Sequence, residues 1–198
     1  MTMKPLSIFK KAIFGASIVS TVTMAAEIPS HVIKAYQEGL AGSQAQNQLA
    51  INALKELNEQ TPSPITLAML GSAETTQARY TNQPWQKMKF AELGISKLNK
   101  AVKQVNKAPY PQQARVYITA GCTFSQVPKM MNRAEHGDHL LKQVIAERSE
   151  FEKLNNQLKK MTYRCAAMAA DKLEDQPRAK SLLEKSETLA QLLKSEKE

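Results

Sequence analysis

Residues 62–73 read PSPITLAMLGSA, and residues 109–123, further along the chain, read PYPQQARVYITAGCT. Both stretches begin with a Pro-x-Pro segment, continue as an apolar run and reach a small-residue step at Gly71 or Gly121. Such repetition is typical of chains built from similar helix pairs, which usually present a surface for binding rather than a pocket for chemistry. The two stretches therefore predict an all-α fold made of repeated helix pairs.

Apolar residues recur at helical spacing along most of the chain. Steps of three and four residues place such a series on one face of a helix that packs on a core. Residues 112–125 include a strand-like run at Val116 to Thr119, but we predict a helix because a lone strand has no partner. The pattern predicts about eight helices and no strand. The two clearest series are Met88, Ala91, Ile95, Leu98, Val102, Val105 and Phe151, Leu154, Leu158, Met161, Cys165, Met168, and shorter ones cover 30–42, 44–59, 64–79, 138–149 and 179–193.

The start of the chain has the three-part composition of a secretory signal peptide. Lys4, Lys10 and Lys11 precede an uncharged run over residues 12–22, and small residues follow up to Ala25. We expect residues 1–25 to be cleaved, a helical domain over 27–194 and a disordered tail over 195–198. The run is too short to span a bilayer stably, although an uncleaved N-terminal anchor is the alternative. The expected location is the periplasm.

The charge balance restricts the class of partner. The net charge is +9, and removal of residues 1–25 leaves 24 basic against 18 acidic residues, or +6. A mildly basic exported protein favours acidic partners. Its lysines occur as pairs and short alternations, whereas nucleic-acid binding needs a clustered basic stripe, so no nucleic acid is expected.

The last two predicted helices combine small residues, such as Ala166, Ala170 and Ala179, with large ones, such as Tyr163 and Leu183. At these spacings they resemble a tetratricopeptide repeat, in which small residues stand where two helices cross and large ones where pairs meet. The stretch from Pro64 to Met131 is also similar to a group of uncharacterised bacterial exported proteins, through residues 70–73, Pro84-Trp85 and the lysine-rich segment 87–101. The resemblance implies antiparallel helix pairs stacked as a short tetratricopeptide-like α-solenoid. The matching positions of the repeat are Tyr163, Ala166, Ala167, Ala170, Ala179, Leu183 and Ser186.

This resemblance also implies a concave groove lined by the first helix of each pair. The inward positions would include Arg115 and Arg164, with Met161 and Met168 beside them. Arginine can bind carboxylates and methionine offers an adaptable apolar wall, so the expected ligand is an extended, partly acidic peptide. The alternative is a pair of ordinary surface arginines. Trp85 could anchor a partner, or it could fasten its loop onto neighbouring helices.

Two further groups of residues could carry chemistry or cross-links. Cys122 and Cys165 are a disulfide candidate in an oxidising compartment, with two buried free thiols as the alternative. Within residues 135–139, His136, Asp138 and His139 are of metal-ligand type, but their spacing implies no further ligand. The alternative there is a polar helix start capped by Asp138. No nucleophile motif or phosphate loop occurs, and we expect no cofactor.

The sequence therefore predicts an exported, non-catalytic scaffold that binds another protein or peptide. One alternative is a small metal-binding or hydrolytic enzyme centred on residues 135–139. Another is a structural protein that self-associates through Leu189 to Leu193.

Overall fold

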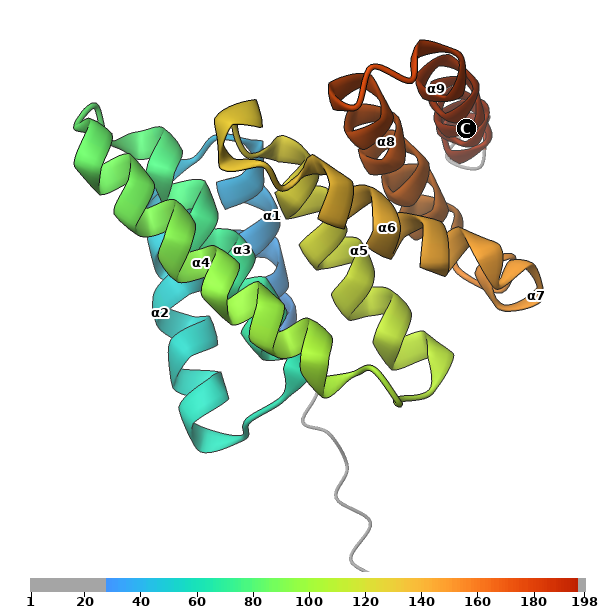
Figure 1. Cartoon of the computed structure of the whole chain (residues 1–198). Coiled ribbons are helices and arrows are strands. Elements are labelled where there is room, and N and C mark those ends of the chain that lie inside the picture. The colour runs from blue at the N-terminus through green and yellow to red at the C-terminus, as the bar shows by residue number, and fades with distance from the viewer. Residues whose placement is uncertain (1–27, 196–198) are drawn as a thin grey trace, which may run out of the picture.

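The computed structural model describes residues 28–195, and over this range it is all-α (Figure 1). The predicted signal peptide and residues 196–198 of the predicted tail lie outside the described residues. The described part contains nine α-helices, two short 3-10 turns and no strand, in agreement with the predicted fold class. The helices are α1 Ser30–Ala41, α2 Gln44–Gln60, α3 Pro64–Gln77, α4 Pro84–Gln104, α5 Tyr110–Gln126, α6 Ala134–Ala146, α7 Arg148–Phe151, α8 Asn156–Lys172 and α9 Gln176–Ser195, with turns at Ala78–Tyr80 and Lys129–Met131.

The helix starts follow from local sequence. Pro64 and Pro84 are the first residues of α3 and α4, where proline's missing N–H costs nothing. Ser63 caps α3 by accepting a hydrogen bond from the Thr66 N–H at 3.2 Å. Asn155 caps α8 in the same way, with the Leu158 N–H as donor at 2.9 Å.

Consecutive helices form pairs that cross at small residues. The pairs are α1 with α2, α3 with α4, α5 with α6, and α8 with α9. A Cβ atom on Gly71 would lie 2.7 Å from the carbonyl oxygen of Gly94, and one on Gly121 would lie 3.1 Å from that of Gly137. The first distance is shorter than real Cβ atoms show and the second is tighter than most of them, so both crossings favour glycine. The crossings at Gly71 and Gly121, predicted from the sequence, are confirmed.

The first helices of the pairs lie against one another, and α3 is the most enclosed. Residues 66–73 of α3 are all buried, with α1, α2, α4 and α5 packed around them. A chain of hydroxyl groups crosses this region: Tyr36 of α1 donates to Ser72 Oγ of α3 at 3.0 Å, and Thr123 Oγ1 of α5 lies 2.9 Å from the same atom. Desolvation raises the pKa of Tyr36 to about 12, so the phenol stays a neutral donor.

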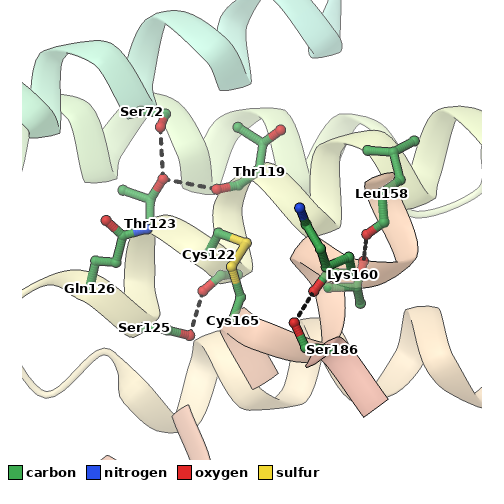
Figure 2. Close-up of a disulfide and its surroundings, with 12 residues drawn as sticks. Ser72, Thr119, Cys122, Thr123, Ser125, Gln126, Leu158, Lys160, Cys165 and Ser186 are labelled. Carbon is green, nitrogen blue, oxygen red and sulfur yellow. Dashed lines mark hydrogen bonds between the residues drawn. A yellow bond between two sulfur atoms is a disulfide. The ribbon is translucent and has the colours of Figure 1, made fainter. Parts of the chain in front are cut away.

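A disulfide joins α5 to α8. The sulfur atoms of Cys122 and Cys165 are 1.98 Å apart, and both residues are buried (Figure 2). The free-thiol alternative is therefore wrong. Because α8 pairs with α9, the bond ties the last helix pair of the described chain to α5.

Four details of the sequence prediction are wrong. The series from Phe151 to Met168 is not one helix: Phe151 ends α7 in the core, and α8 begins only after the Asn155 cap. The helix predicted over 138–149 spans Ala134–Ala146, so Asp138 lies inside it and is not its cap. Met88 is 45% exposed because buried contacts of α4 begin only at Ala91. Ser195, predicted as part of the tail, is the last residue of α9.

Candidate partner-binding groove

An open groove of about 700 Å³ is lined by residues of α1, α5, the α7–α8 connection, the start of α8 and α9. Residues distant in sequence share it, since Gln37 lies on α1 and Leu193 near the end of α9. Its lining mixes leucines with side-chain amides and two cations. The lining residues are Gln37, Arg115, Glu152, Leu154, Asn155, Asn156, Gln157, Leu158, Lys159 and Leu193. This lining can contact both the apolar and the polar groups of an extended ligand.

Arg115 supplies the groove with a cation that has no acidic partner among the described residues. It lies on α5 seven residues before Cys122, which places both on nearly the same side of the helix. Its side chain is exposed. The other cation, Lys159, differs because its side chain is 13% exposed and its Nζ lies 3.2 Å from a carboxylate oxygen of Glu152. Arg115 is therefore the lining group best placed to attract an anionic ligand.

The predicted α8 residues lie beside the groove and not in it. One side of α8 carries a row of residues spaced by four, three and four positions: Gln157, Met161, Arg164 and Met168. Gln157 lines the groove, and Arg164 is exposed without an acidic partner in the described chain. Met161 is 36% exposed, whereas Met168 is half-buried against the core. The row therefore continues from the groove along one side of α8, with Met168 contributing mainly to packing.

Trp85 lies outside this groove. It occupies the first turn of α4, a helix that contributes no groove residue, and it is 63% exposed. The alternative that Trp85 fastens its loop to the neighbouring helices is therefore wrong.

Some residues that line the groove were not singled out from the sequence, among them Gln37, Asn155 and Lys159. Asn155 carried a usable signal, because an asparagine three residues before Leu158 is a typical helix cap. Gln37 carried none, since its place in the lining depends on how the helix pairs pack. Leu193 was named from the sequence, but as part of a self-association surface and not of a groove.

The segment from Glu135 to His139 is built into the packing of α6. Asp138 is buried, accepts a hydrogen bond from Arg178 at 2.7 Å and forms an ion pair with Lys142 at 2.8 Å. The ring of His136 stacks on Phe124 with centroids 4.9 Å apart. Within residues 28–195, no group of three His, Cys, Asp or Glu side chains could hold a metal ion. The contacts here join α6 to α5 and α9.

His136 should make the stability of the protein depend on pH. Its pKa is lowered below the ordinary value of 6.5, mainly by burial and also by the nearby His139 and Arg133 charges. The folded state therefore favours the neutral ring. The contribution of His136 to the free energy of unfolding is complete above pH 6.5. It declines as the pH falls from 6.5 through the lowered pKa of the folded state.

We expect urea unfolding to show this loss between pH 7.5 and 5.5. A His136→Phe variant keeps an aromatic ring against Phe124 but cannot titrate, so it should lose less stability over the same interval. An equal loss in the variant would assign the pH dependence to other groups.

The leucines predicted as a self-association surface lie near the end of α9. Leu189, Leu192 and Leu193 are spaced by three and four residues and so share one side of the helix. Leu192 is 48% exposed, and the other two are half-buried. Leu193 also lines the groove.

The described residues define an all-α protein of paired helices with an open groove and one disulfide. No family model matches the chain, and no curated protein or solved structure is significantly similar to it. No helix within residues 28–195 is long and apolar enough to cross a membrane.

Proposed function

We propose that this protein is an exported, non-catalytic scaffold that binds a protein or peptide partner in the groove around Arg115. The observation that carries the proposal is an exposed arginine without an acidic partner in the described chain, set in an open groove of about 700 Å³. An extended peptide fits such a lining better than a small substrate does, because small-molecule sites are usually enclosed and more apolar.

The chemistry of the lining indicates an acidic partner segment. Arg115 can bind a carboxylate through two parallel hydrogen bonds, and Arg164 on the adjoining row of α8 can bind a second. Leu154 and Leu158, both half-buried, leave apolar surface for the side chains between the two acidic positions. The amides of Gln37 and Gln157 can hydrogen-bond the peptide backbone. We further propose that the pairs stack as a tetratricopeptide-like solenoid, in which the first helices α1, α5 and α8 supply most of the groove, and that the protein acts in the periplasm.

Charge reversal of the two arginines is the direct test. The double variant Arg115→Glu, Arg164→Glu should bind an acidic partner at least tenfold more weakly, because each substitution replaces attraction with repulsion. The measurement is crosslinking and pull-down from envelope extract, followed by the affinity of the partner so identified. Lys55→Glu, Lys180→Glu is the matched control, because it makes the same change in net charge at two exposed sites on α2 and α9.

The control variant should keep its affinity within about twofold. Equal binding by the wild type and the arginine variant, or an equal loss in the control, would contradict the assignment of the groove.

A further inference from the structure

The outward side of α4 combines exposed apolar side chains with lysines. The core side of this helix is formed by Ala91, Gly94, Ile95, Leu98 and Ala101, all buried. On the outward side, Trp85 is 63% exposed, and Met88 and Leu93 are each 45% exposed. Figure 1 shows α4 in the foreground, with its length uncovered by any other described helix. We call Trp85, Met88, Lys89, Leu93, Lys100 and Lys103 the α4 surface.

The lysines of this surface are aligned with Trp85. Residues 85, 89, 100 and 103 fall within about 60° of one another around an α-helix of 3.6 residues per turn. Lys89, Lys100 and Lys103 are exposed and have no acidic partner among the described residues, whereas Lys97 pairs with Glu74 at 2.6 Å. The helix carries five lysines and one glutamate, a net charge of +4 out of +9 for the whole chain. The single glutamate, Glu92, lies 3.9 Å from Arg133.

We propose that the α4 surface lies flat on an anionic phospholipid bilayer, with Trp85 and Met88 entering the headgroup region. Tryptophan is favoured at that depth because its ring is apolar and its N–H is polar. The aligned lysines meet the negative headgroups while their alkyl stems cover apolar surface. Trp85, Met88 and Leu93 expose apolar surface beside these lysines, which a lipid interface can bury and a phosphate backbone cannot.

This arrangement is independent of the groove. No α4 residue lines it, so a protein resting on a membrane through α4 keeps the groove available to a partner. The inference therefore adds a membrane-surface function and does not rest on the proposed one.

The single tryptophan of the chain makes the proposal testable by fluorescence. Trp85 emission is recorded as the protein is titrated with vesicles of phosphatidylcholine, with or without one-third phosphatidylglycerol. Both the full chain and a chain beginning at Glu27 are used, and the signal reports on α4 in each. We expect a shift to shorter wavelength with the anionic vesicles, its loss at high salt and no shift with the neutral ones.

Two triple variants that keep Trp85 make the same change in net charge. The first variant is Lys89→Gln, Lys100→Gln, Lys103→Gln. It should lower the vesicle partition coefficient about 10²-fold, because each lysine near an anionic surface raises that coefficient by a factor of about five. Lys55→Gln, Lys180→Gln, Lys194→Gln removes exposed lysines of α2 and α9 and should keep most of the partitioning. Circular dichroism establishes that both remain helical.

Three outcomes would overturn the proposal. They are an unchanged Trp85 spectrum with anionic vesicles, an equal response to neutral vesicles, and equal weakening by the two triple variants. Lysine-dependent binding to duplex DNA without binding to vesicles would likewise replace the membrane with a nucleic acid.

Discussion

Replacing Gly94 with alanine is expected to destabilise the fold by more than about 3 kcal/mol. A Cβ at this position would meet Thr75 Oγ1 and the carbonyl oxygen of Gly71, and would lie 2.6 Å from the backbone nitrogen of Thr75. Two of these three atoms belong to the backbone of α3, and α3 is buried on all sides, so α4 must move away from it. Urea unfolding monitored by circular dichroism measures the loss.

A loss of stability in Gly94→Ala would identify the helix crossing as its cause, because alanine normally favours a helix. In an unhindered helix interior, glycine to alanine stabilises by about 1 kcal/mol, so a loss can come only from the crossing. Gly121→Ala is the comparison within the protein. Its Cβ would meet Leu141 Cγ at 2.7 Å, and a side chain can shift more easily than a backbone, so the loss should be smaller. A Gly94→Ala variant as stable as the wild type would show that the two helices are not packed this closely.

The sequence predicted the helices well because their signals are local. Spacing of apolar residues, proline at helix starts and glycine at crossings each act within a few turns, and α5 is helical despite the strand-like Val116 to Thr119. The series from Phe151 to Met168 gave the wrong prediction of one continuous helix. Its spacing of three and four residues continues across residues 152–155, although the chain turns there. The cap at Asn155, and not the apolar pattern, decides that boundary.

The surfaces were less predictable because they depend on which helix sides remain uncovered. Arg115 was named from the family resemblance, yet nothing local indicates that Gln37 would line the same groove. In the sequence, the lysines of α4 occur as pairs and short alternations, a pattern that does not indicate a shared surface. Only the helix brings Lys89, Lys100 and Lys103 to the side of Trp85, and only the packing of α3 and α4 leaves that side exposed.

Loss of the disulfide is expected to cost about 4 kcal/mol of unfolding free energy. The bond closes a loop with a sequence separation of 43 residues, and the chain-entropy model assigns that value to a loop of this length. The cost should appear when the wild type is treated with a reducing agent, and also in Cys122→Ala and Cys165→Ala. Unfolding by urea at neutral pH, with and without the reductant, gives each value.

The two single variants and the double variant separate the cross-link from ordinary packing. Each single substitution already removes the whole bond, so the double variant should be little worse than either one, and their losses should be strongly non-additive. Additive losses would mean that the cysteines contribute as separate core residues. A loss of about 4 kcal/mol is a large part of the 5–15 kcal/mol that stabilises a typical domain. Disulfides persist in oxidising compartments, so the bond between α5 and α8 is compatible with the proposed export.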